Sequence, residues 1–143
     1  MAAFKGTNAT LRGATPPSLV SNGDQGGRVR CTYDEITTTT AMTTADTIEV
    51  GLLPVDARVV GVHVSWIAHA TSRTFILGDA GDDNRYVAST DASAAGRSDA
   101  LAATGQGYRN TTGAPVPILL TLAGGTLAAG AKGYTVALFY LTD

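Results

Sequence analysis

From residue 28 onward, hydrophobic and polar side chains alternate with a period of two, the pattern of β-strands that bury one face. The alternation is clearest over 57–68, where Val60, Val62, Val64 and Trp66 share one face and smaller or polar residues share the other. We expect this apolar face to lie in the centre of the core. The same pattern predicts further strands over 28–36, 47–54, 73–79, 85–89, 116–123 and 134–141.

The segment 28–36 is predicted to be the first strand of the folded domain. Val29, Cys31 and Tyr33 alternate there with charged or polar residues. This alternation predicts that the three residues face the core. The only cysteine of the chain is therefore expected at a buried and unreactive position.

Turn signals rich in Gly, Asp and Pro separate about seven or eight short strands, and no long amphipathic helix is available to connect parallel strands. The segment 91–107 is rich in Ala, Ser and Gly and is expected to form a surface loop. The fold class predicted is all-β, an antiparallel β-sandwich or jelly roll with an extended N-terminal arm.

Residues 1–27 differ from the rest of the chain because they combine many Gly and Pro residues with isolated apolar ones. Such a composition cannot form a core of its own, so we expect an arm over 1–27 and one β-sandwich domain over 28–143. The spaced apolar residues favour an arm laid across a neighbouring molecule, while a frayed terminus remains the alternative.

Charged residues make up 15% of the 143 residues, well below the figure of about 25% typical of globular proteins. The surface should therefore be weakly polar, and a partner or further copies of the chain should cover part of it, unless a large core accounts for the apolar residues.

The net charge is −2 and the basic residues are scattered, which argues against nucleic-acid binding. With one cysteine and no secretory signal pattern, we expect folding in a reducing cytoplasm.

The sequence contains no pattern typical of a catalytic, metal or cofactor site. His63 and His69 lie about 20 Å apart if one straight strand carries both, too far to share a metal ion. Asp79, Asp82 and Asp83 are the one local group of carboxylates, and we interpret them as a solvated turn, with calcium binding as a minor alternative. We expect no enzyme activity and no cofactor.

A carbohydrate-binding module would need exposed aromatic residues. Aromatic residues make up 6% of the chain, and most of them lie in predicted core strands. Only Tyr86 and Tyr108 are expected to be available at the surface, which makes sugar or host-receptor binding a second choice.

The segment 46–81 resembles a pattern in the head cement or decoration proteins of tailed phages, including those of short-tailed phages such as one that infects Bordetella. There, a strand ending in Gly-x-Leu-Pro leads into an Ala-Arg-Val-Val strand and then, through Ala-Thr, into an apolar strand ending in Gly-Asp. The closing YTVALFYL also fits, although small tail and neck proteins share such motifs. The matching positions are Gly51 to Pro54, Ala57 to Val60, Ala70 with Thr71, and Gly78 with Asp79.

The resemblance implies a structural protein on the outer surface of an icosahedral capsid, where many copies bridge neighbouring coat subunits. The implied partners are the major capsid protein and the chain itself, as a homodimer or homotrimer, with no nucleic acid and no membrane. The implied location is the virion, assembled in the cytoplasm of the bacterial host. A host-surface-binding module and a neck or tail component remain the alternatives. We expect protein contacts at Phe4, Leu11, Leu19 and Val20 in the arm, and at Tyr108 and Arg109 after the Ala-rich segment.

Overall fold

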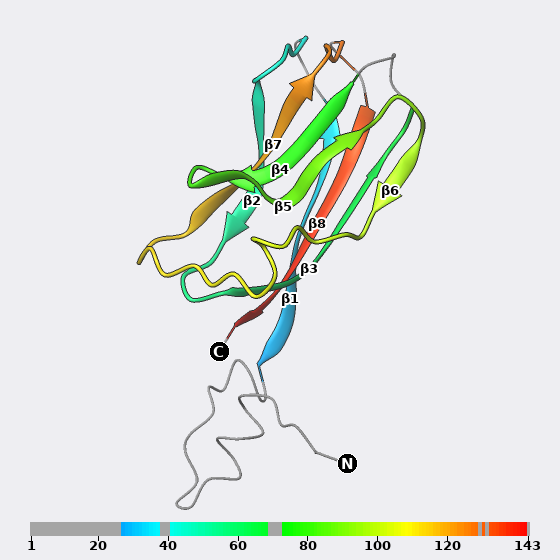
Figure 1. Cartoon of the computed structure of the whole chain (residues 1–143). Coiled ribbons are helices and arrows are strands. Elements are labelled where there is room, and N and C mark those ends of the chain that lie inside the picture. Colours follow the sequence, from blue (N-terminus) through cyan, green and yellow to red (C-terminus); the bar gives the residue numbers. More distant parts are fainter. Residues whose placement is uncertain (1–26, 38–40, 69–72, 129, 131, 143) are drawn as a thin grey trace, which may run out of the picture.

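The computed structural model describes residues 27–37, 41–68, 73–128, 130 and 132–142, so the predicted arm lies outside the described residues except for Gly27. Eight strands follow one another along the described chain (Figure 1). They are β1 (Arg28–Thr37), β2 (Thr47–Leu53), β3 (Arg58–Trp66), β4 (Thr74–Asp79), β5 (Asp82–Asp91), β6 (Gly96–Ser98), β7 (Val116–Gly124) and β8 (Lys132–Thr142).

The strands form two four-stranded sheets, and every pairing within them is antiparallel. The first sheet has the order β1-β8-β3-β6 and the second has the order β2-β7-β4-β5. The chain changes sheet at every connection except that between β4 and β5. The predicted all-β antiparallel class is confirmed, and the described residues contain no helix. One short strand, β6, lies within the segment that was expected to be a loop.

The two sheets pack face to face, and their inward side chains form one hydrophobic cluster. Phe75 on β4 is fully buried near its centre. Its ring makes edge-to-face contacts with Trp66 on β3 and Tyr134 on β8, each with 5.1 Å between ring centroids. Such edge-to-face pairs are a favourable arrangement of aromatic rings. The expectation that these aromatic residues lie in core strands is confirmed.

The predicted inward face of β1 is wrong. Val29 and Tyr33 expose 64% and 60% of their surface, and Cys31 is also exposed, whereas Ile36 is buried. The register explains the arrangement, because Ile36 lies opposite Tyr134 of β8, a core residue, while Tyr33 lies opposite Ala137 on the outer face. A period of two separates the faces of a strand but does not say which face is covered.

The predicted core face of β3 is wrong at one position. Val59 is fully buried while Val60 is 46% exposed, and the register against β8 shifts between Val59 and Gly61. A β-bulge inserts one extra residue on a strand and so reverses the phase of the alternation at that point. Val62 and Val64, beyond the bulge, face the core as expected.

The segment after β6 folds back along the end of the two sheets instead of extending into solvent. The backbone N–H of Val59 donates to the carbonyl of Tyr108 at 2.8 Å, and the N–H of Ala102 donates to that of Tyr86 at 2.9 Å. Fully buried Asn110 donates from Nδ2 to the carbonyls of Leu53, Pro54 and Ala114. These bonds hold the segment in place because buried backbone polar groups need partners.

Candidate functional site

The outer side of the first sheet carries a continuous group of apolar side chains, which we call the outer face. The β1–β8 register places Val29 opposite Leu141 and Cys31 opposite Phe139, all on the side away from the core. Phe139 also lies opposite Gly61 of β3, where a Cβ atom would come within 3.6 Å of its ring. The outer face therefore consists of Val29, Cys31, Tyr33, Phe139 and Leu141, spread over β1 and β8.

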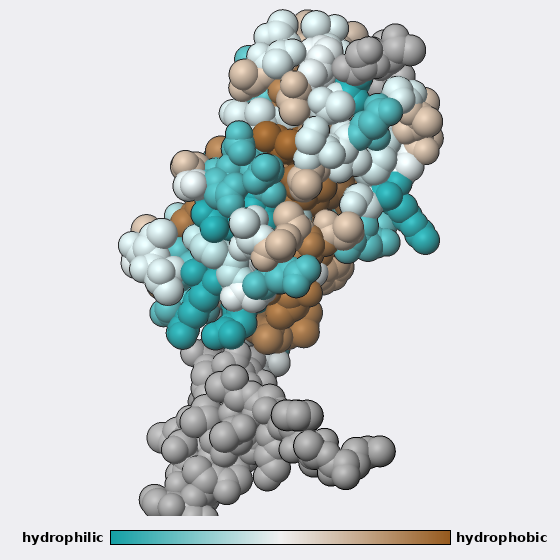
Figure 2. Space-filling model, viewed as in Figure 1, coloured by the Kyte–Doolittle hydropathy of each residue, from teal (hydrophilic) through white to brown (hydrophobic). Residues whose placement is uncertain are grey.

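On the outer face, Val29, Cys31 and Tyr33 are exposed, while Phe139 and Leu141 are half-buried. The opposite side of β8 carries Tyr134, Val136, Leu138 and Tyr140, all of which are buried. Figure 2 shows hydrophobic surface gathered near the end of the domain where β1 starts and β8 ends. Contiguous apolar side chains that are exposed or half-exposed to solvent mark surfaces that bind other proteins.

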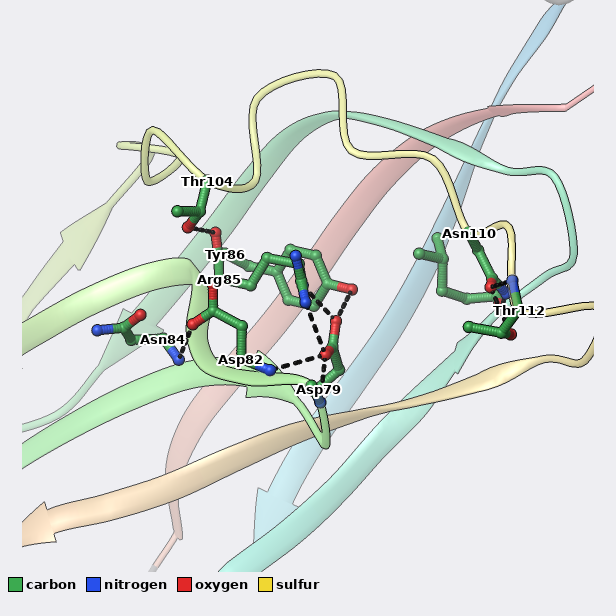
Figure 3. A network of polar contacts seen from close by, with 10 residues as sticks. Asp79, Asp82, Asn84, Arg85, Tyr86, Thr104, Asn110 and Thr112 are labelled. Carbon is green, nitrogen blue, oxygen red and sulfur yellow. Dashed lines mark hydrogen bonds and ion pairs between the residues drawn. The ribbon is translucent and has the colours of Figure 1, made fainter.

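A second feature is the buried carboxylate of Asp79 at the end of β4, which is only 3% exposed. It accepts hydrogen bonds from the backbone N–H groups of Gly81 at 2.9 Å and Asp82 at 3.1 Å. Arg85 donates to it from Nε at 2.7 Å, and the Tyr86 hydroxyl donates at 2.9 Å (Figure 3). Four residues thus donate hydrogen bonds to a single carboxylate.

The electrostatics of this group follow from burial and hydrogen bonding together. Burial by itself raises the pKa of Asp79, but the hydrogen bonds from Arg85 and Tyr86 outweigh it and hold that pKa below its usual value. Burial, followed by the hydrogen bond to Asp79, strongly raises the pKa of Tyr86. Asp79 is therefore an ionised structural group that closes the β4–β5 hairpin.

The group also connects the hairpin to the segment that follows β6. The guanidinium carbon of Arg85 lies 4.1 Å from the ring centroid of Tyr108, in a cation–π contact. The Tyr108 ring in turn packs edge-to-face against Tyr86, with 6.3 Å between the centroids. The prediction that Asp79 lies in a solvated turn is therefore wrong, because protein donors surround its carboxylate.

Two of the predicted contact residues, Tyr108 and Arg109, lie in the described part of the chain, and neither is one of the five residues of the outer face. Tyr108 is half-buried and covered by Arg85, and Arg109 forms an ion pair with Asp56 at 3.3 Å. Phe4, Leu11, Leu19 and Val20 lie outside the described residues. A contact role for these six residues stays a prediction. The expectation that Tyr86 is available at the surface is wrong, since that residue is fully buried.

No side-chain cluster in the described residues offers metal-ion chemistry. His63 pairs through Nδ1 with Asp99, and Arg97 lies 4.0 Å from the other oxygen of the same carboxylate. His69 lies outside the described residues. Across the part of the chain that the structure describes, no three His, Cys, Asp or Glu side chains gather closely enough to hold a metal ion.

The described residues also include no helix that is long and apolar enough to cross a membrane.

Sequence reasoning missed the outer face, although β8 carried a signal for it. Apolar residues occupy both faces of this strand, with Ala137, Phe139 and Leu141 on the side opposite the core. Such a run indicates either burial on both sides or one apolar side exposed to solvent. Only the position of β8 in its sheet decides between the two.

Comparison with known proteins gives matches in structure alone. No protein-family model matches the sequence, and no curated protein sequence matches it. A chain of the capsid asymmetric unit of cyanophage Pam1 has a TM-score of 0.67 and 24% identity, over 91% of this chain and 96% of that one. A chain of the capsid of Ralstonia phage GP4 has a TM-score of 0.68 and 23% identity, over 84% of this chain and 88% of that one. At these identities, the chain shares the fold of these two phage capsid chains.

Proposed function

We propose that this chain is a structural virion protein that binds the outer surface of an icosahedral phage capsid and bridges neighbouring coat subunits. The observation that carries the proposal is the likeness to chains from two phage capsids, which covers nearly the full length of both. The motifs in 46–81 point independently to the cement proteins of tailed phages. The narrower match to short-tailed phages stays a prediction.

The proposed mechanism is additive binding without a catalytic step. Each copy would contact the major capsid protein and other copies of itself, as a homodimer or homotrimer, so that several modest interfaces combine into durable attachment. A ligand that binds only the assembled shell stabilises that shell by mass action. The protein would act in the virion after assembly in the host cytoplasm.

We further propose that the fold is a jelly roll. The sheet orders β1-β8-β3-β6 and β2-β7-β4-β5 support this, because an eight-stranded jelly roll distributes its strands over two such sheets. In this arrangement the first and last strands are neighbours, as β1 and β8 are. The outer face then lies on one broad side of the domain and is available to a coat subunit.

The test is co-sedimentation of the purified chain with capsids that lack it, with the bound copies counted from the pellet. We expect saturable binding at many copies per capsid. Phe139→Ala should weaken it about tenfold or more, because the substitution removes a central apolar group of the outer face. The matched control is Ile67→Ala, which truncates a residue that is 56% exposed directly after β3 and should leave binding almost unchanged.

The outcome separates this proposal from its alternatives. Absence of binding, or only a few copies per particle, would overturn the cement role and favour a neck or tail component. Binding to glycans without binding to capsids would favour the host-surface module. Equal binding by the Phe139→Ala variant and the wild type would show that the outer face is not the contact.

A further inference from the structure

The strand β1 forms one edge of the first sheet and has a partner on one side. Its ten residues pair with β8, and no described strand pairs with its other side. An edge strand leaves a row of backbone N–H and C=O groups without ladder partners, so a long exposed edge is a template for another strand. Val29 and Tyr33, both largely exposed, lie on this same strand.

The charges of β1 are arranged so that the strand complements itself. Arg28 and Arg30 lie in its first half, Asp34 and Glu35 in its second half, and Thr32 between them. Within the described residues, no ion pair engages Arg28, Arg30 or Asp34. Arg30 instead donates from Nε to the Thr142 hydroxyl at 3.1 Å.

We propose that β1 pairs antiparallel with β1 of a second copy, around a twofold axis at Thr32. Successive residues of a strand lie on opposite faces of the sheet. A twofold axis perpendicular to the sheet therefore places each residue of one strand opposite a residue of the second copy that lies on the same face. With Thr32 on the axis, Arg30 lies opposite Asp34 of the second copy, and Cys31 lies opposite Tyr33 of the second copy. Two opposite-charge pairs then form, one on each side of the axis.

A second copy fits this edge better than an unrelated partner does. An interface with twofold symmetry must be complementary to itself, which is the property that the charge order of β1 has. Pairing would also join the two first sheets into one continuous sheet. Because the twofold axis keeps like faces on the same side, the outer faces of both copies would merge into one larger apolar surface.

This inference deepens the proposed function, since it names the surface through which one copy of the protein would bind another. Only the biological purpose of the dimer rests on the proposed function. Dimer formation is measurable without any capsid. A monomer that still binds capsids would therefore contradict this inference alone. A dimer that does not bind capsids would contradict the proposed function alone.

The first test is a charge exchange followed by sedimentation equilibrium of the full chain. The wild type should be a dimer, and Arg30→Asp should weaken it about tenfold or more because like charges then face each other. The double variant Arg30→Asp with Asp34→Arg should restore dimerisation. Arg97→Asp, on β6 at the opposite edge of the same sheet, is the control and should leave the dimer intact. A wild type that is monomeric at about 1 mM, or no restoration by the exchange, would overturn the proposal.

The second test uses the exposed thiol of Cys31 and does not depend on how the charge variants fold. Directly opposed residues have Cβ atoms about 4.5–5.5 Å apart, whereas diagonal neighbours are about 7–8 Å apart. Mild oxidation of Tyr33→Cys should therefore yield a covalent dimer linked between positions 31 and 33. The wild type, with Cys31 alone, should stay unlinked. A rapid Cys31–Cys31 crosslink in the wild type would show a different register and overturn the proposed axis.

Discussion

Asp79 lies among polar and glycine residues that suggest a solvated turn, yet its side chain is almost fully buried. Arg85 and Tyr86 reach its carboxylate because β5 runs back antiparallel beside β4. Gly78 is needed in the same hairpin, since a Cβ atom there would come within 2.2 Å of the Asp82 carbonyl oxygen. The sequence shows the residue types of this turn, but only the hairpin brings their side chains together.

We predict that Asp79→Asn lowers the free energy of unfolding by about 3 kcal/mol at neutral pH, because it leaves the Arg85 guanidinium without its partner in a largely buried setting. The pKa of Asp79 is lowered in the folded state. Its stabilising effect is therefore present above the unfolded pKa, near 4, and is lost as the pH falls through the folded value. The variant should lack this part of the acid sensitivity in urea unfolding measured across pH.

The control for this prediction is Asp83→Asn, which changes an exposed carboxylate of the same hairpin. It should alter the unfolding free energy by less than about 0.5 kcal/mol. Equal effects of the two substitutions would show that Asp79 does not hold the hairpin closed.

At the scale of elements, the period of two located the strands more reliably than it oriented them. The predicted strand at 57–68 contains β3, and that at 134–141 lies within β8. The inward side of β1 was predicted wrongly because the strand carries apolar residues on both faces. The bulge in β3 was missed because both Val59 and Val60 are valine, and composition does not distinguish an inward from an outward residue.

The bulge in β3 predicts that substitutions at two adjacent valines destabilise the protein to very different extents. Val59→Ala should lower the free energy of unfolding by about 2 kcal/mol, since it leaves a cavity in the core at a fully buried side chain. Val60→Ala should cost less than about 0.5 kcal/mol because that side chain is largely exposed. Denaturant unfolding of the two variants checks this directly, and the reverse order would place the bulge elsewhere.

At the scale of the whole molecule, every described member of the hydrophobic core lies at Ile36 or beyond. The domain predicted over 28–143 should therefore fold without the preceding residues. We propose that the two parts of the chain have different roles, so that the domain provides the stability and the arm provides additional binding.

We predict that a chain beginning at Gly27 keeps the thermal unfolding midpoint of the full chain to within about 2 °C, as calorimetry would measure. The same truncation should weaken capsid binding, because it removes Phe4, Leu11, Leu19 and Val20. A large drop in the midpoint would show that the arm belongs to the core. Unchanged capsid binding would show that the arm makes no contact with the shell.

The sequence alone determined the all-β antiparallel class, the position of most strands and the aromatic centre of the core. These follow from local alternation and turn residues, which depend on neighbours along the chain. The tertiary structure alone decided which side of β1 and β8 faces away from the core, where β3 bulges, and that Asp79 is enclosed. Each of these depends on which strands become neighbours in space, and the alternation within one strand is the same whichever of its faces the second sheet covers.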